Sequence, residues 1–309
     1  MKMQSSRTNS QTVVSIIIPT FGSNTNPCRA IESVFEQDYP FIEVVVVDDN
    51  GKGTPQQIKN EKAFQKYKDK DDFVYLIHES NMNGSVARNT GANAAKGSFL
   101  CFLDDDDYFS DSQKISKQVS VLEILDSTFA GSFSSLRIID SRKKVRFVKA
   151  KDNGNLLINF IKSKLSIGTG APIISKSSFI ELGGFNECFD HHQDWEFFAR
   201  LLDKFKLKAV HDAYYDREYK IIPKRGLDLR KIRMDRYVCL MKNCIQSLKK
   251  RTLYRLMKEK YYPLYLACLR DKNKKLRKAI YSENRFNVFD CIKMFFYALV
   301  YFVKNILKI

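Results

Sequence analysis

Four consecutive carboxylates, Asp104 to Asp107, directly follow a short apolar run at residues 99–103. Like charges this close repel one another, so the cluster needs something positive to bind it. Three interpretations are open: a solvated acidic loop, an EF-hand, and a site for a hard divalent cation. The nearest EF-hand loop would begin at Asp48. It has Lys52 and Lys59 where oxygen ligands are required, which excludes that motif.

The cation site explains more of the pattern than a solvated loop does. Mg²⁺ and Mn²⁺ prefer oxygen ligands, and Mg²⁺ is commonly held by one or two carboxylates and completed by substrate phosphates. This accounts for the number of aspartates, and the apolar run before them reads as a strand that fixes them. The sequence therefore favours Mn²⁺ or Mg²⁺ as the cofactor, bound together with a phosphate-bearing substrate.

The elements that would position these residues alternate along the first 110 positions. β-branched apolar runs separated by helix-like stretches are typical of βαβ units in a parallel sheet covered on both faces. The expected strands are 13–18, 42–47, 73–77 and 99–103, and the expected helices are 28–37, 54–67 and 85–96. Ligands of open α/β sheets bind beyond the carboxyl ends of the strands. Both acidic clusters, Asp48–Asp49 and 104–107, are expected at that edge.

The pattern after residue 110 is less regular. It predicts a helix at 112–125, strands at 131–139 and 171–174, and a helix at 194–205. Beyond residue 226, Lys and Arg alternate with apolar side chains at helical spacing. The predicted fold class is α/β, a mainly parallel sheet between helices with a basic helical extension at the C-terminus.

Composition sets the limits of this interpretation. With 309 residues, 44% of them hydrophobic, the chain can bury a sizeable core. The polar N-terminus does not resemble a secretory signal, so we expect a cytoplasmic protein. The seven cysteines include no CxxC pair, which favours reduced thiols over a disulfide framework or a zinc site.

The net charge of +17 is distributed unevenly. Residues 1–216 contain 27 Lys and Arg against 28 Asp and Glu, whereas residues 217–309 contain 25 against 7. This change marks a boundary near residue 216. We expect a flexible N-terminus at 1–12, a domain at 13–220 that holds the acidic clusters, and a basic helical region at 221–309.

Five motifs occur in a fixed order: SIIIPTF at 15–21, VVVVDDN at 44–50, NGSVARNTG at 83–91, FLDDDD at 102–107, and GGFNE followed by HQDWEFFARL between 183 and 201. In this order and spacing they resemble the inverting, nucleotide-sugar-dependent glycosyltransferases of family 2, whose fold is called GT-A. The resemblance covers roughly residues 13–220. It implies a GT-A fold there and transfer of a sugar, from a UDP-sugar in the first instance, to a hydroxyl of a glycan or lipid-linked glycan acceptor.

The resemblance also implies a donor site. Pro19, Thr20 and Phe21 would line the pocket for the nucleotide base, and Asp49 would accept the ring N–H of uracil or a similar base. Asp49 could instead be a turn residue at a strand end. Arg88 would either contact the nucleotide or pair with the aspartates.

The aspartates Asp104 and Asp106 match the DxD motif of the family. Asp106 would be the metal ligand, with Asp104 and Asp105 reaching the ribose or the sugar. A divalent ion suits this chemistry, because it neutralises the charge that develops on the departing nucleoside diphosphate.

Inversion requires a general base that takes the proton from the acceptor hydroxyl. Asp194 matches the family's base, although it could instead only cap the helix that follows it. The family often has Glu before this Asp, and this chain has Gln193. No QxxRW motif of processive members follows residue 200, so one sugar is expected per encounter.

The basic C-terminal region suggests a partner of opposite charge. No nucleic-acid-binding module is recognisable, and the final apolar run, 294–303, is too short to span a membrane. An anionic membrane surface is the preferred partner, with Phe286 among the side chains entering the lipid, although an ordinary core helix is the other interpretation. By resemblance, such enzymes work on polyprenyl-diphosphate-linked acceptors at the inner face of the bacterial membrane, in surface-polysaccharide synthesis.

Two other functions compete. A nucleotidyltransferase would ordinarily have a Gly-rich, basic phosphate loop near the first strand, which IIIPTFGSNTNP lacks. A non-catalytic basic adaptor for membrane or nucleic acid is disfavoured, because Asp49, Asp104, Asp106 and Asp194 are all present.

Overall fold

The computed structural model describes residues 12–22, 25–151, 156–162, 164–189 and 192–219, and beyond these chiefly 244–270 and 274–284. The chain divides into two compact units, one of residues 1–156 with 165–221 and the other of 157–164 with 222–309. All the site residues selected above belong to the first unit.

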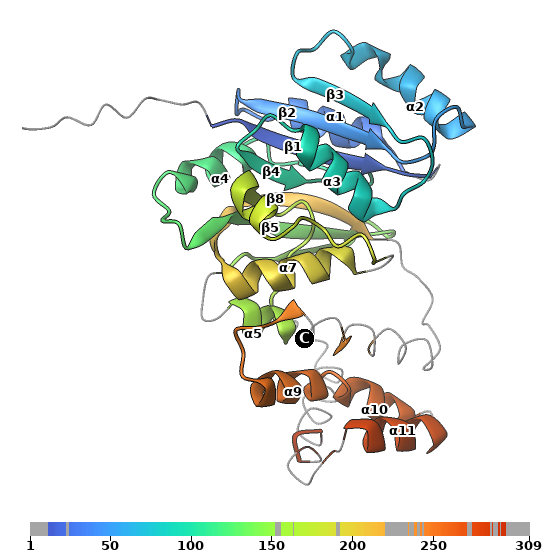
Figure 1. Cartoon of the computed structure of the whole chain (residues 1–309), viewed down its shortest axis with the longest axis vertical. Helices are drawn as coiled ribbons and strands as arrows, with labels where there is room; N and C mark the ends of the chain where they lie inside the picture. The colour runs from blue at the N-terminus through green and yellow to red at the C-terminus, as the bar shows by residue number, and fades with distance from the viewer. Residues whose placement is uncertain are drawn as a thin grey trace, which may run out of the picture. The chain divides into compact units, whose positions relative to one another are not determined.

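The first unit is an α/β structure built on one sheet (Figure 1). Its strands are β1 (Val14–Thr20), β2 (Ile42–Asp48), β3 (Phe73–Ile77), β4 (Phe99–Phe102), β5 (Phe129–Asp140), β6 (Val145–Val148), β7 (Pro172–Ser175) and β8 (Lys206–Tyr219). Its helices are α1 (Pro27–Phe35), α2 (Pro55–Phe64), α3 (Gly84–Ala94), α4 (Lys114–Leu122), α6 (Lys176–Glu181) and α7 (Gln193–Lys204). A 3-10 turn, η1 (Gln65–Tyr67), follows α2, and α5 (Leu156–Ile161) falls mainly in the second unit.

Strands β1 to β4 are parallel and adjacent in the order β3-β2-β1-β4. The crossovers through α1 and α2 lead outward from β1, whereas the crossover through α3 leads back across β1 to β4. Because such crossovers are right-handed, α3 covers the face opposite to α1 and α2. The Val and Ile residues of β1 and Val44 to Val47 of β2 are buried on both faces, as this arrangement requires. The predicted α/β class with a mainly parallel sheet and these four strands are confirmed, whereas the basic helical extension stays a prediction.

The other strands extend the sheet beyond β4. β7 is antiparallel to β4, and β5 is antiparallel to β7, so β5 runs in the direction of β1 to β4. β8 pairs in parallel with β5 along its whole length, with a register shift at Ser134/Ser135, and β6 pairs with β5 through Leu136 to Ile139 (Figure 1). The carboxyl ends of β5 and β8 therefore reach the same sheet edge as the acidic clusters.

The sequence analysis predicts neither β6 nor β8. β8 reads KLKAVHDAYYDREY, in which charged residues interrupt the apolar ones and no clear alternation survives the irregular register with β5. β6 is exposed at three of its four positions, so it has no apolar pattern to reveal it. The helix expected at 54–67 is α2, which ends at Phe64 and tightens into η1.

The described part of the second unit contains α9 (Lys250–Glu259), α10 (Tyr262–Arg270) and α11 (Lys274–Asn284). The ring of Phe286 is buried and packs against Tyr262, Tyr265 and Tyr281. The expectation that Phe286 enters a membrane is therefore wrong. Residues 295–309, which hold most of the final apolar run, lie outside the described residues. No helix in the described part has the length and hydropathy needed to cross a bilayer.

Lys114 is fully buried at the start of α4, and its substitution provides a test of the core. Its ammonium lies 3.9 Å from Cys101 Sγ and 4.4 Å from the centre of the Phe109 ring. Burial lowers the pKa of Lys114, although Cys101 and Asp111 oppose the shift. The unfolded chain therefore holds this proton more tightly than the folded chain, and the cost to stability lessens as pH rises towards the usual pKa of lysine.

We expect Lys114→Met to raise the free energy of unfolding at neutral pH by on the order of 1–3 kcal/mol, since an apolar side chain of similar length needs no desolvation of charge. The gain should shrink between neutral pH and pH of about 10. Thermal unfolding across this range, with exposed Lys59→Met as the control, measures it. A destabilised Lys114→Met protein would show that the buried ammonium contributes net stability.

Candidate active site

The carboxyl ends of the parallel strands surround a cavity of about 570 Å³. It brings together all the residues that the resemblance implies for donor and metal binding: Pro19, Thr20, Phe21, Asp49, Arg88, Asp104, Asp105 and Asp106. The wall also contains residues that the sequence analysis did not select: Asn81, Asn83, Gly84, Ala87 and Gln193. The two asparagines follow β3 at the edge where parallel sheets bind ligands, and this position is the signal that could have identified them.

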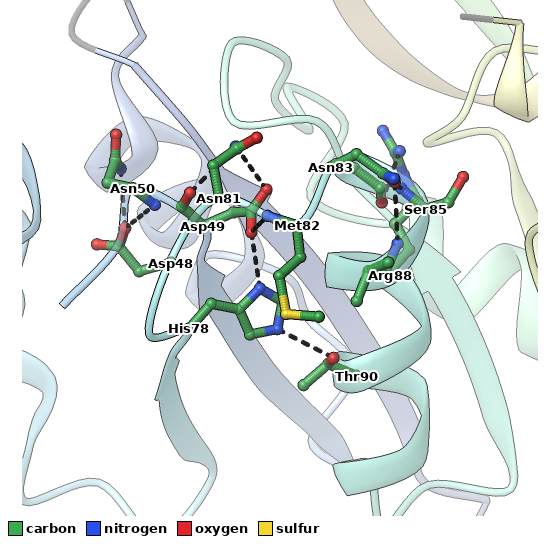
Figure 2. A network of polar contacts seen from close by, with 12 residues as sticks. Asp48, Asp49, Asn50, His78, Asn81, Met82, Asn83, Ser85, Arg88 and Thr90 are labelled. Atoms are coloured by element: carbon green, nitrogen blue, oxygen red, sulfur yellow. Dashed lines mark hydrogen bonds and ion pairs between the residues drawn. The ribbon is translucent and has the colours of Figure 1, made fainter. Parts of the chain in front are cut away.

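Three protein donors fix the carboxylate of Asp49 (Figure 2). Oδ1 accepts from His78 Nδ1 at 2.7 Å and from the backbone N–H of Met82 at 2.8 Å, and Oδ2 accepts from Asn81 Nδ2 at 2.9 Å. His78 Nε2 lies 3.0 Å from Thr90 Oγ1 on α3, so its ring is held at both nitrogens (Figure 2). An ionised carboxylate has about four acceptor positions. Asp49 therefore keeps acceptor capacity at a wall of the cavity.

The neighbouring Asp48 has a structural role. It is fully buried and accepts hydrogen bonds from the backbone N–H and the side chain of Asn50, from Asn60 Nδ2 and from Tyr75 Oη. Asn50 in turn accepts from the backbone N–H of Gly22 at 2.8 Å. This chain of contacts ties the loop after β1 to the end of β2, next to Phe21.

The four aspartates after β4 alternate between buried and partly exposed positions. Asp104 and Asp106 are half-buried at the cavity, Asp105 is buried although it also belongs to the cavity wall, and Asp107 is buried away from it. Burial raises the pKa of Asp105 to about 6, and the charges of Asp106 and Asp104 add to this. Burial likewise raises the pKa of Asp107, again with contributions from Asp104 and Asp106. The turn thus presents its first and third carboxylates to the cavity.

Arg29 of α1 supports the backbone of this acidic turn. The sequence analysis does not identify Arg29. One guanidinium nitrogen donates to the carbonyl oxygen of Asp106 at 2.7 Å, and another pairs with Glu218 of β8 at 2.7 Å. The guanidinium also lies 4.3 Å from the centre of the Tyr108 ring. Arg29 is therefore a positioning residue that fixes the backbone of Asp106.

Arg88 of α3 joins the acidic turn to the start of α7. Its Nη2 donates to Asp104 Oδ1 at 2.6 Å, and its Nη1 donates to Gln193 Oε1 at 3.0 Å. Of the two roles considered for Arg88, pairing with an aspartate is what the structure contains. Gln193 thus keeps a link to Arg88 where the family often has Glu.

Asp194 follows Gln193 as the second residue of α7. The N-cap of α7 is His192, in a left-handed conformation with φ of 62°, so Asp194 is not the capping residue. Burial raises the pKa of Asp194, and the charge of Asp104 adds to the shift, whereas Arg88 opposes it. Asp194 directly follows Gln193, which lines the cavity and binds Arg88, so it lies at the rim of the cavity.

The loop at 182–187, which precedes α7, is held by side chains of α3 and α7. Asn89 of α3 exchanges hydrogen bonds with the backbone of Phe185 and donates to Glu187, while Arg200 of α7 donates to the carbonyl oxygens of Leu182 and Gly184. A Cβ at Gly184 would lie 2.7 Å from Asn89 Oδ1, and the φ there is +70°, so only glycine fits. These contacts fix the approach to Asp194.

Arg217 of β8 is a further charged neighbour that sequence reasoning missed. Burial acts against its charge, but Tyr215, Asp107, Asp104 and Asp194 raise the pKa of Arg217. It therefore counteracts the repulsion between the acidic turn and Asp194.

Fold and site together define the class. An open, mainly parallel sheet with a DxD turn at its carboxyl edge is the GT-A fold, and solved structures agree. Residues 1–349 of S. aureus TarS in complex with UDP superpose with a TM-score of 0.56 at 22% identity, covering 80% of this chain and 70% of that chain. The mannosyltransferase PcManGT from Pyrobaculum calidifontis, in complex with GDP-Man and Mn²⁺, gives a TM-score of 0.54 at 19% identity, covering 84% and 71%.

The family follows from the sequence match. Residues 15–182 match the family described as glycosyl transferase family 2, and the chain belongs to that family. An uncharacterized glycosyltransferase of Rickettsia felis is 30% identical over 62% of this chain, although the match spans only 31% of that relative. The amylovoran biosynthesis glycosyltransferase AmsB of Erwinia amylovora is 26% identical over 69% of this chain and 71% of its own length.

The acidic turn fits a divalent metal ion. Asp104 and Asp106 offer oxygen atoms at the cavity, which is the donor type that Mg²⁺ and Mn²⁺ prefer. No group of three or more His, Cys, Asp or Glu side chains suited to a metal occurs in the described part of the chain. This set suits an ion that is bound by few protein ligands and completed by phosphate oxygens.

Proposed function

We propose that this protein is a metal-dependent, inverting and non-processive glycosyltransferase. It transfers a sugar from a nucleoside diphosphate sugar, in the first instance a UDP-sugar, to a hydroxyl of a glycan or lipid-linked glycan acceptor. AmsB and the putative teichuronic acid biosynthesis glycosyltransferase TuaG of Bacillus subtilis support a place in cell-surface polysaccharide biosynthesis. The nucleotide sugars bound in the structures of TarS and PcManGT, UDP-GlcNAc and GDP-Man, support the donor class.

One observation carries the proposal: Arg88 binds both Asp104 of the acidic turn and Gln193, the cavity residue directly before Asp194, so a carboxylate at the start of α7 lies next to the acidic edge of the cavity. A nucleotidyltransferase needs the acidic edge but has no use for a base at the start of α7. A non-catalytic adaptor needs neither. The glycosyltransferase is the function that uses both groups.

The residues divide the reaction between them. Asp49 accepts a ring N–H of the base, Phe21 lies against the base, and Asp106 with Asp104 would hold a divalent ion. When bound, that ion neutralises the charge that develops on the nucleoside diphosphate. Asp194 takes the proton of the acceptor hydroxyl while the hydroxyl oxygen forms a bond to the anomeric carbon of the sugar. The bond between that carbon and the phosphate oxygen breaks, and its electron pair leaves with the diphosphate. Attack opposite the leaving group inverts the anomeric carbon.

We further place the protein in the cytoplasm, at the inner face of the cell membrane, where polyprenyl-diphosphate-linked acceptors would meet it. The support is the basic excess after residue 216, which suits anionic headgroups. No nucleic acid is expected as a partner.

The test is a screen of UDP-, GDP- and TDP-sugars for thermal stabilisation, with Mn²⁺ or Mg²⁺ and with chelator. A ligand at 100 times its dissociation constant adds about 2.7 kcal/mol to the free energy of unfolding, which is readily measured. Stabilisation by one nucleotide class that requires the metal is the expected result. No stabilisation by any nucleotide sugar under either condition would refute the proposal.

A further inference from the structure

The hairpin formed by β5 and β6 presents a concentrated positive charge, and we call residues 141–151 the basic hairpin. Its sequence, SRKKVRFVKAK, holds six of the 27 Lys and Arg residues that precede residue 217, and no Asp or Glu. Residues 1–216 contain 28 Asp and Glu, so the rest of that stretch is acidic by seven charges. The charge is therefore local to this hairpin and separate from the basic C-terminal region.

The basic hairpin also exposes apolar side chains. Residues 141–147 are all exposed. Val145 and Phe147 lie two positions apart on one face of β6, with exposed fractions of 44% and 62%. Two cations form ion pairs, Arg142 with Asp140 at 3.7 Å and Lys143 with Glu218 at 3.8 Å. The other four cations, Lys144, Arg146, Lys149 and Lys151, form no ion pair with the residues that the structure describes.

The position of the basic hairpin relates it to the cavity. Leu100 of β4 and Gly131 of β5 both pair with Ile174, so they lie at the same level in the sheet. β4 ends two residues later, whereas β5 continues to Asp140, which is about 20 Å more of strand at the usual rise per residue. Only β6 and β8 accompany it among the described strands. The basic hairpin therefore reaches beyond the sheet edge at which the cavity lies.

Protection of a sheet edge does not explain this composition. Lys and Arg on an edge strand prevent pairing with another chain, and β6 is such a strand. An edge strand that only had to avoid pairing with another chain would not expose Phe and Val, because exposed apolar side chains favour association between proteins. Cations around an exposed aromatic ring instead match a lipid surface, where the ring enters the headgroup region and the cations meet anionic headgroups.

We propose that the basic hairpin docks the catalytic unit on an anionic membrane, with Phe147 entering the interface. The sheet edge with the cavity then faces the lipid, which is where a lipid-linked acceptor presents its hydroxyl. The benefit to catalysis rests on the proposed function, but the docking itself does not.

The first test uses the full chain and vesicles of phosphatidylglycerol with phosphatidylcholine. K144E/R146E should lower the vesicle partition coefficient about tenfold or more at low salt, and the difference should diminish as salt screens the charges. The matched control is K59E/K62E, which makes the same charge change on exposed positions of α2. Equal vesicle binding by K144E/R146E and K59E/K62E would overturn the proposal. The proposal would also fail if K144E/R146E lost binding to RNA or to a soluble acidic polysaccharide but kept its binding to vesicles.

The second test separates the basic hairpin from any contact made by the C-terminal region. F147W should be quenched by brominated lipid in the vesicles beyond the wild type, whose only tryptophan is Trp195. I58W, at an exposed position of α2, is the control and should show no added quenching. No added quenching of F147W would overturn the proposal. Metal-dependent UDP binding, measured on the same proteins, reports separately on the proposed function.

Discussion

Asp194→Asn should lower kcat about 10²- to 10⁴-fold, the range usually lost with a general base, and leave UDP-sugar affinity unchanged. The amide has nearly the shape of the carboxylate but cannot take the proton. Asp194 lies beside Gln193 at the rim of the cavity, not among the residues that line it, so the donor should bind as before. Single-turnover transfer and calorimetric donor binding measure the two quantities. Asp203→Asn, near the other end of α7, is the matched control.

The pH profile adds a second readout. Because burial raises the pKa of Asp194, the acid limb of kcat should lie at a higher pH than an ordinary aspartate gives. Asp194→Asn should abolish that limb along with the rate. Wild-type turnover in the variant would leave Asp194 without a catalytic role and would remove the general base from the mechanism.

Asp106→Ala should abolish the dependence of UDP binding on Mn²⁺ or Mg²⁺ while the fold is retained. An ion held by few protein ligands cannot readily lose one of them. Arg29 holds Asp106 through its backbone carbonyl, so truncating the side chain leaves that support of the turn in place. Titration calorimetry of UDP with and without Mn²⁺ is the measurement.

Asp71→Ala removes an exposed carboxylate just before β3, at the opposite end of the strands, and should behave as the wild type. If Asp106→Ala bound UDP with unchanged metal dependence, the metal would have to be held elsewhere and the assignment of the DxD turn would fail. Loss of binding with and without metal would instead indicate damage to the donor pocket as a whole.

Local pattern was sufficient to predict the centre of this fold. β1 and β2 are buried almost throughout, and β3 and β4 are likewise continuous apolar runs, so the four segments stand out in the sequence and end sharply near the residues that reach the cavity. β8 escaped prediction because it is amphipathic without regular alternation, and its stability comes from β5, more than 60 positions earlier in the chain. A pattern in one segment carries no information about such a partner.

The site divides in the same way. The residues that we propose for donor binding lie in motifs, and the sequence predicted their common location. The residues that hold them do not: Arg29 meets a carbonyl 77 positions away and a carboxylate 189 positions away, and its neighbours in sequence give no sign of either. His78 was missed for a related reason, since a lone histidine after a strand has many structural explanations until Asp49 is seen beside it.

The three donors around Asp49 have a consequence for which nucleotides compete for the site. All three groups donate to the carboxylate oxygens of Asp49, so in the proposed donor site this side chain presents acceptor lone pairs to the base. Uracil, thymine and guanine bring a ring N–H to such a group, whereas the corresponding nitrogens of adenine and cytosine carry lone pairs and would be repelled. Leaving two acceptors face to face in a desolvated pocket costs about 1–3 kcal/mol or more. Adenine nucleotides such as ATP, which also bind divalent ions through their phosphates, would thereby be excluded from the proposed donor site.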